Sequence, residues 1–240
     1  MTGEESLRGG NSAGEVVRVG PTVRRRPGTN ADFVRRLLAH LAGIGFDAAP
    51  RWLGIDAAGR DVFAYIDGAT TDHPLQRSEA AYRAGGRLLR ALHDATSGHA
   101  LAGGCECVLH GDPGPFNTIY RGGLPVALID WDSAGPGDRL WDLSYMAWTW
   151  CVEGTPSISV ADQARRLREL RDGYGMGGAD VLVAAIVERQ RSIAGRARRL
   201  LAQAGQTGRF YGHQRSAIAW AERDRRHLER HAGEFEAALR

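Results

Sequence analysis

Two short segments near the middle of the chain carry the side chains that could do chemistry. They are His110-Gly-Asp-Pro-Gly-Pro-Phe-Asn117 and Leu128-Ile-Asp-Trp-Asp132. A carboxylate on a tight loop, as Asp112 is, can orient a hydroxyl group and accept its proton. The amide oxygen of Asn117 and the carboxylate of Asp130 are hard oxygen ligands of the kind that Mg²⁺ prefers. These groups together suit phosphoryl transfer, in which a protein mainly positions an alcohol, a phosphoanhydride and magnesium.

The signal lies in residue types at fixed spacing, at positions His110, Gly111, Asp112, Asn117 and Asp130. By average residue usage, such a combination occurs at about one in a million starting positions. Two apolar pieces, 118–120 and 126–129, predict a short hairpin that would return Asp130 to the side of Asn117. The spacing therefore favours a single site.

Each of these polar residues also has a simpler interpretation. Asp112 and Asn117 could merely cap turns, where Asp and Asn are common. Asp130 could be a turn residue at the end of a strand. We expect His110 to brace the loop by hydrogen bonds rather than to transfer a proton. Asp132 could be a second metal ligand or a support for the loop.

The elements before this region predict a small β-rich part. Residues 1–14 have the composition of a loop. The elements expected after them are strands over 16–19 and 22–25, a helix over 30–42, and strands over 51–55 and 62–66. Asn30 could cap this helix, and the spacing of its apolar residues predicts a buried face that holds Phe33, Leu37, Leu38 and Leu41.

The remainder of the chain predicts a larger, mainly helical part. Helices are expected over 78–96, 138–151, 161–174, 179–204 and 212–238. Ser78 could cap the first of these helices, and we expect Trp148 and Trp150 to lie in the core. With a hinge near 67–71, the predicted division is 1–68 and 69–240.

Four motifs resemble the aminoglycoside phosphotransferase and choline-kinase-like family, whose members are distant relatives of protein kinases. The catalytic loop His-x-Asp-x-x-x-x-Asn is matched at 110–117, and the metal-binding segment is matched by Ile129-Asp130-Trp131-Asp132. A later pattern is matched by Gly137-Asp138-Arg-Leu-Trp-Asp142-Leu143, and the pair before the loop is Leu92-His93. The resemblance is specific over 82–150 and weak over 7–68.

The resemblance implies an α+β, bilobal protein-kinase-like fold, with a small β-rich N-terminal lobe and a larger helical C-terminal lobe. It implies transfer of the γ-phosphate of ATP or GTP to a hydroxyl of a small molecule, such as an aminoglycoside, an amino-alcohol or a sugar. Asp112 would be the base and His110 its neighbour in the catalytic loop. Asn117, Asp130 and Asp132 would hold Mg²⁺.

The chain departs from this family at the nucleotide phosphates. The family places a lysine on a strand of the small lobe and pairs it with a glutamate on the next helix, but the chain has no lysine, and the helix over 30–42 has Asp32 and no glutamate. Arg24 or Arg25 stands at the expected strand position, and Gly9 and Gly10 could belong to a loop that covers the nucleotide. The alternative function is therefore a pseudokinase, which would bind a nucleotide or another ligand without turnover.

Composition excludes several other classes of protein. The chain has 240 residues, of which 43% are hydrophobic and 25% charged, so wholesale disorder is excluded. No apolar run is long enough to span a membrane, and the acidic, polar N-terminus does not look like a secretory signal. With three cysteines, a reducing cytoplasm is the expected location.

Two further interpretations are disfavoured by the pattern around the residues concerned. Cys105, Cys107 and His110 could suggest zinc, but the second ligand pair typical of a structural site is not visible. The arginines over 189–199 and 223–230 could suggest nucleic acid. They are interleaved with acidic residues, which is typical of a solvated, ion-paired face, so we do not expect nucleic acid as a partner.

Overall fold

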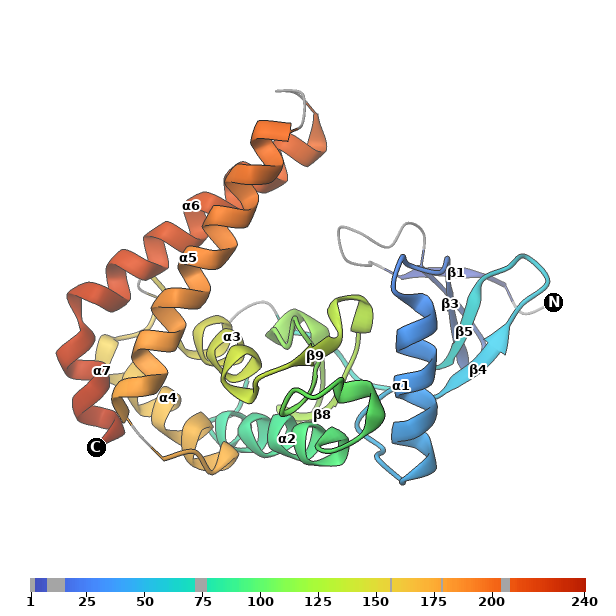
Figure 1. Ribbon diagram of the computed structural model, residues 1–240, viewed down its shortest axis with the longest axis horizontal. Coiled ribbons are helices and arrows are strands. Elements are labelled where there is room, and N and C mark those ends of the chain that lie inside the picture. Colours follow the sequence, from blue (N-terminus) through green and yellow to red (C-terminus); the bar gives the residue numbers. More distant parts are fainter. Residues whose placement is uncertain (1–2, 8–15, 72–76, 156, 178, 204–207) are drawn as a thin grey trace. The chain divides into compact units, whose positions relative to one another are not determined.

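The structure, a computed structural model, describes residues 3–7, 16–71, 77–155, 157–177, 179–203 and 208–240. The chain forms two compact units, Met1–Ser78 with Leu88–Arg139 and Glu79–Arg87 with Leu140–Arg240. The strands of the described residues all belong to the first unit, and the second unit is helical (Figure 1). The α+β class is therefore confirmed, while a separate lobe that ends at residue 68 stays a prediction.

The N-terminal part of the first unit is a five-stranded antiparallel sheet in the order β1-β2-β3-β5-β4. Its strands are β1 (Glu5–Leu7), β2 (Val16–Val19), β3 (Thr22–Arg25), β4 (Trp52–Ile55) and β5 (Asp61–Ala64). The strands expected over 16–19 and 22–25 are confirmed, and β2 pairs with β3 as a hairpin around Gly20-Pro21. The prediction that residues 1–14 form only a loop is wrong, because Glu5–Leu7 pairs with β2.

Helix α1 (Ala31–Gly43) follows β3 and buries one face. Its buried residues are Val34, Leu37, Leu38 and Leu41. Phe33, which we expected on this face, is only half-buried. Asn30 occupies the N-cap position, as expected, but its side chain makes no capping hydrogen bond.

The rest of the first unit is built from short strands and turns that follow a helix shared with the second unit. These elements are α2 (Ala80–Thr96), η2 (Ala100–Ala102), β6 (Cys107–Leu109), η3 (Pro115–Asn117), β7 (Thr118–Arg121), β8 (Leu124–Leu128), η4 (Trp131–Ser133) and β9 (Gly135–Gly137). The predicted hairpin is confirmed by the pairing of β7 with β8, whereas the pairing of β6 with β9 was not predicted. Helix α2 begins at Ala80, and the Ser78 hydroxyl donates to the Gly123 carbonyl.

The second unit contains the helices of the C-terminal half. They are α3 (Arg139–Cys151), α4 (Val160–Tyr174), α5 (Ala179–Gln203), α6 (Arg209–Arg230) and α7 (Ala232–Leu239). The single helix expected over 212–238 is wrong, because the chain breaks at His231 into α6 and α7. His231 hydrogen-bonds the Glu234 side chain through its ring, at 2.7 Å.

The core of the second unit contains both tryptophans that we expected to be buried. Trp148 and Trp150 have at most 1% of their surface exposed. The indole of Trp148 donates to Asp224 at 2.9 Å and stacks on Trp220, with ring centroids 4.2 Å apart. A buried carboxylate therefore has a hydrogen-bond partner, as burial of a charge requires.

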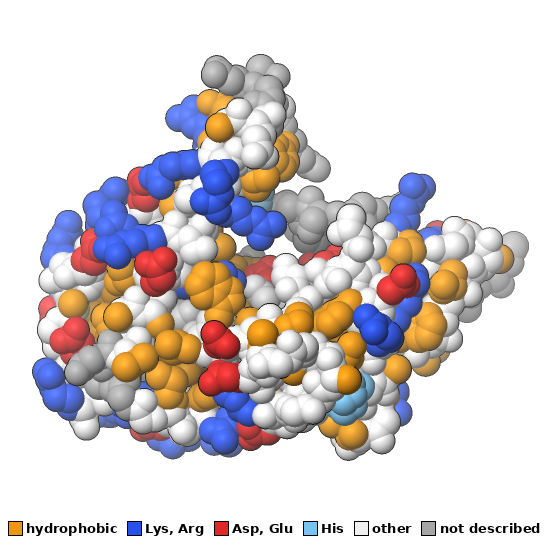
Figure 2. Space-filling model, in the orientation of Figure 1, with side chains coloured by type: hydrophobic (Ala, Val, Ile, Leu, Met, Phe, Trp, Pro, Cys, Tyr) orange, Lys and Arg blue, Asp and Glu red, His pale blue; other side chains and the backbone are white. Residues whose placement is uncertain are grey.

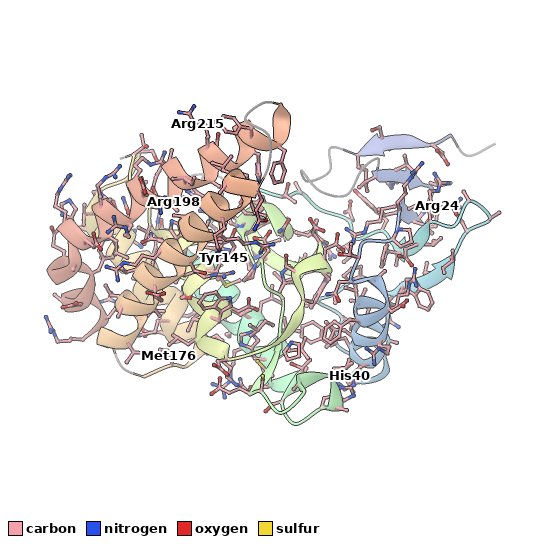
Figure 3. All side chains as sticks on the ribbon, turned by 45° about the horizontal axis from the view of Figure 1, so that its top comes forward. Arg24, His40, Tyr145, Met176, Arg198 and Arg215 are labelled. Atoms are coloured by element: carbon pink, nitrogen blue, oxygen red, sulfur yellow. The ribbon has the colours of Figure 1, made fainter. Side chains whose placement is uncertain are left out.

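The arginines of α5 and α6 form a surface that is largely ion-paired. Blue side chains gather over these two helices in Figure 2, and Figure 3 labels Arg198 on α5 and Arg215 on α6. Arg198 pairs with Glu222, and Arg191 pairs with Glu229 at 3.3 Å. The pairing agrees with the solvated face that the sequence predicts. None of the helices in the described part of the chain combines the length and apolar character that crossing a bilayer requires.

His227 gives the second unit an expected sensitivity to acid. Burial lowers the pKa of this imidazole, and the nearby His231 lowers it further. The unfolded chain therefore binds a proton more readily than the folded chain, so stability is lost as pH falls through about 6.5. We expect His227→Gln to flatten the dependence of Tm on pH between about 7 and 5. Thermal melts at several pH values test this, and an unchanged slope would contradict it.

Candidate active site

A cavity of about 390 Å³ lies within the first unit. Most of its wall is apolar, and it includes Val23, Val34, Leu38, Phe63, Ile66 and Ile129. Of the described residues that line it, Arg25 and Asp130 carry charge, and Asn117 adds an amide. A hollow of this size with a few polar groups at one side is typical of a small-molecule site.

The loop with Asp112 begins with a turn that requires glycine. Gly111 has φ of 85°, and a Cβ at this position would collide with the carbonyl oxygen of Ser133. Both the left-handed backbone and the close approach therefore exclude a side chain. This turn brings the loop against the segment that follows Asp130.

His110 holds this loop in place from inside the protein. Its side chain is fully buried, its Nε2 bonds the Ile129 carbonyl at 3.0 Å, and its Nδ1 bonds the backbone N–H of Asp112 at 3.4 Å. Because a carbonyl can only accept and an amide N–H only donates, Nε2 carries the proton and Nδ1 is bare. The geometry supports a bracing role for His110.

Asn117 connects the catalytic loop to the strand end that carries Asp130. Its Nδ2 donates to the carbonyl oxygen of Asp112 at 3.0 Å, and its own carbonyl accepts from the N–H of Ile129 at 2.9 Å. The second bond continues the pairing of β7 with β8, so the hairpin brings Asn117 and Asp130 to the same cavity. This is the convergence that the sequence predicts.

The carboxylate of Asp112 has an oxygen without a partner. Its Oδ1 is buried and accepts no hydrogen bond from the described residues. Leaving a buried acceptor unsatisfied costs about 1–3 kcal/mol, so such an atom in a folded protein calls for an explanation.

The alternation of β3 decides which arginine faces the cavity. Arg25 lines it, whereas Arg24 points to the other face and pairs with Asp56 at 3.5 Å (Figure 3). The Nη1 of Arg25 donates to Asp130 at 2.9 Å, and its Nη2 donates to Asp132. Arg25 therefore joins both carboxylates of the segment that the sequence singles out.

The helix α1 supplies no acidic partner for Arg25. Asp32, the acidic residue in its first turn, has a side chain that is 93% exposed and pairs with Arg35. Arg35 also pairs with the buried Asp61 of β5 at 2.8 Å. The ion pair that joins α1 to the sheet therefore does not involve Arg25. Asp130 and Asp132 are thus the partners that the structure gives to Arg25.

Two residues that the sequence did not identify as part of the site lie against Asp132. The Nδ2 of Asn30 donates to the carbonyl oxygens of Asp132 at 3.4 Å and of Ala134 at 2.8 Å. A Cβ on Gly28 would lie 3.2 Å from both carboxylate oxygens of Asp132, so this close approach favours glycine. Gly28 and Asn30 follow the strand of Arg25 directly in the sequence, and this proximity is the signal that could have identified them as part of the site.

Asp130 has an unusual backbone. Its φ is 62°, and it is the one residue other than glycine with a positive φ in the described part of the chain. Such conformations cost of order 1 kcal/mol and concentrate at functional sites, where surrounding contacts enforce them. The Asp130 carboxylate accepts from Arg25, and Asp130 lines the cavity.

The donor atoms at this site fit magnesium and a nucleotide. Asn117, Asp130 and Asp132 offer amide and carboxylate oxygens. The two carboxylates already bind one cation, the guanidinium of Arg25. The apolar wall of the cavity suits the flat ring of a nucleobase. Gly9 and Gly10, expected in a loop over the nucleotide, lie outside the described residues.

The described residues contain no group of three or more His, Cys, Asp or Glu side chains that could hold a metal ion. Cys105, Cys107 and His110 are accordingly not gathered into such a group. Cys105 is exposed, while Cys107 is buried.

Comparisons with known proteins agree with these motifs. A family model described as "Phosphotransferase enzyme family" matches residues 98–179. The trifolitoxin immunity protein of Rhizobium leguminosarum bv. trifolii is 36% identical over 199 residues, which cover 73% of this chain and 76% of that protein.

Solved structures show the same fold at low identity. A choline/ethanolamine kinase family protein from Mesorhizobium loti is 20% identical, with a TM-score of 0.66 over 99% of this chain and 92% of that chain. A macrolide 2′-phosphotransferase from Brachybacterium faecium is 18% identical, with a TM-score of 0.60 over 91% of each chain. The fold class that the motifs imply is thus confirmed.

The catalytic-loop and metal-binding motifs both lie within the segment 98–179 that the family model matches. The similarity to the trifolitoxin immunity protein extends over 73% of the chain. The chain belongs to the phosphotransferase enzyme family of aminoglycoside phosphotransferases and choline-type kinases, which share the protein-kinase-like fold.

Proposed function

We propose that this chain transfers the γ-phosphate of ATP or GTP to a hydroxyl group of a small molecule. The observation that carries the proposal is the buried, unpartnered Oδ1 of Asp112 on a loop that Asn117 ties to Asp130 and the cavity. An acceptor hydroxyl would donate to that oxygen. Family membership supports this reaction type.

The residues of the chain have distinct roles in this reaction. Asp112 orients the hydroxyl and takes its proton as the hydroxyl oxygen bonds to the γ-phosphorus and the bond from phosphorus to the β,γ-bridging oxygen breaks. The nucleoside diphosphate leaves with the electrons of that bond. His110 and Asn117 hold the backbone of Asp112 in position. The apolar side of the cavity would hold the adenine or guanine ring of the nucleotide.

Asn117, Asp130 and Asp132 would hold magnesium. When bound, the ion neutralises charge on the phosphates and orients them. Three free cysteines, two of them buried, support a cytoplasmic location, because disulfides persist mainly in oxidising compartments.

Turnover across a panel of acceptors tests this function. The full chain is incubated with Mg²⁺ and either ATP or GTP, together with amino sugars, amino-alcohols or sugars, and phosphorus NMR detects a new phosphate monoester. We expect at least one acceptor class to give an ester, which Asp112→Asn should form about 10²- to 10⁴-fold more slowly. Nucleotide binding without an ester from any acceptor would contradict transfer.

A second function is favoured by Arg25, which joins the two carboxylates that would hold the metal. The chain could bind a nucleotide or another ligand without turnover, as a pseudokinase. Its relative is named an immunity protein, so either function could protect against a toxin, by modification or by binding. Binding of Mg²⁺–ATP raises Tm in both cases, whereas ester formation occurs only in the first.

A further inference from the structure

We propose that Arg25 acts as a built-in cation that holds Asp130 and Asp132 until nucleotide phosphates draw its guanidinium away. Nucleotide and divalent metal would then bind cooperatively, and neither would bind well alone. This inference rests on the proposed function for the identity of the phosphate ligand. It does not require that the phosphate be transferred.

The contacts of Arg25 occupy the oxygens that a metal would need. Its two terminal nitrogens donate separately to Asp130 and to Asp132, in a fork that matches two carboxylates. The Arg25 side chain is 12% exposed, and those of the two aspartates are 25% and 28% exposed. Burial of this degree reduces the screening that weakens surface ion pairs.

The surrounding structure keeps the two carboxylates at the guanidinium. Asn30 donates to the backbone carbonyl of Asp132, Gly28 lies close to the Asp132 carboxylate, and Asp130 has a left-handed backbone. The ring of Phe63 lies 5.9 Å from the guanidinium carbon. Because Arg25 bonds an oxygen of each carboxylate, a divalent cation that used those oxygens would compete with Arg25.

The phosphates of a nucleotide supply the alternative partner for Arg25. Guanidinium binds phosphate oxygens in the same forked manner as carboxylates. Because Arg25 and Asp130 both line the cavity, phosphates there would lie within the reach of both. When Arg25 shifts from the carboxylates to the phosphates, oxygens of Asp130 and Asp132 become free to bind the metal. Metal bound to these oxygens in turn stabilises the position of Arg25 at the phosphates. By linkage, each ligand must raise the affinity for the other by the same factor.

Binding of Mn²⁺, detected by electron paramagnetic resonance, tests the proposal on the full chain. Without nucleotide, we expect Arg25→Gln to bind Mn²⁺ about tenfold or more tightly than the unchanged chain, which corresponds to ~1.4 kcal/mol. Arg51→Gln is the matched control, because Arg51 is 59% exposed and pairs with Asp47 away from these carboxylates. It should bind Mn²⁺ as the unchanged chain does.

Addition of phosphate ligands tests the coupling. We expect ATP to raise the Mn²⁺ affinity of the unchanged chain about tenfold or more beyond that of ATP alone in solution, and inorganic tripolyphosphate to act similarly. Adenosine, which lacks phosphates, should have no such effect. In Arg25→Gln the increase should shrink to less than about threefold.

Equal Mn²⁺ affinities of Arg25→Gln and the unchanged chain without nucleotide would overturn the proposal. If thermal melts show that Arg25→Gln does not fold, the test rests on the unchanged chain. An increase of its Mn²⁺ affinity by ATP of less than about threefold would then overturn the proposal. Tight ATP binding in EDTA that Mn²⁺ does not strengthen would also overturn it. Coupling without ester formation would support this inference while the transfer proposal fails.

Discussion

Asp112→Asn should lower kcat by about 10²- to 10⁴-fold, which is the range that a general base contributes. The amide keeps the shape of the side chain but cannot take the proton of the acceptor hydroxyl. The backbone contacts of this residue with His110 and Asn117 remain, because they use its N–H and carbonyl. We therefore expect nucleotide affinity to change by less than about threefold. Steady-state kinetics and nucleotide titration together measure both effects.

A matched surface variant controls for the loss of one negative charge. Asp47 lies in the same unit, and its side chain is 82% exposed, so Asp47→Asn should leave kcat unchanged. If Asp112→Asn kept its full kcat with a measurable acceptor, Asp112 would not be the base.

Gly111→Ala should lower the free energy of unfolding by about 2–5 kcal/mol. The left-handed backbone costs about 1–2 kcal/mol for a residue with a Cβ, and overpacking adds about 1–3 kcal/mol. The second cost arises because the added methyl would meet the carbonyl oxygen of Ser133, which is backbone and cannot rotate away. Chemical denaturation measures this loss, and the displaced loop should also reduce turnover.

Two other glycines separate the contributions to this loss. Gly59 also has a positive φ, of 74°, but a Cβ there would meet nothing within 4 Å, so Gly59→Ala should cost only about 1–2 kcal/mol. Gly43, at the end of α1, has neither constraint, and Gly43→Ala should be neutral or slightly stabilising. Equal losses for Gly111→Ala and Gly59→Ala would show that the contact with Ser133 does not constrain the loop.

The parts of the fold that the sequence predicts are those fixed by local patterns. The hairpin around Gly20-Pro21, the helix α1 and the return of Asp130 to Asn117 follow from periodicity and turn residues. The three-residue strands β1 and β9 were missed because they are too short to show a period. The break at His231 was missed because α6 and α7 are separated by a single residue.

The site was predicted where its residues are close in sequence and missed where the contacts are long-range. The spacing of His110, Asp112 and Asn117 indicates the catalytic loop directly. In contrast, Arg25 is more than a hundred positions from Asp130, and alternation alone leaves Arg24 and Arg25 equivalent. Asn30 has the pattern of a helix cap, and only the fold brings its amide to Asp132. Such contacts depend on tertiary structure, which local patterns do not encode.

A crystal structure of the chain with Mn²⁺ and a nonhydrolysable ATP analogue would reveal whether these residues bind the metal and the phosphates together. We expect an anomalous manganese peak coordinated by the Asn117 amide oxygen and the Asp130 carboxylate, with the base of the nucleotide in the apolar cavity. The guanidinium of Arg25 should contact phosphate. A nucleotide bound there with no manganese at these oxygens, and with Arg25 still joined to both aspartates, would contradict the account.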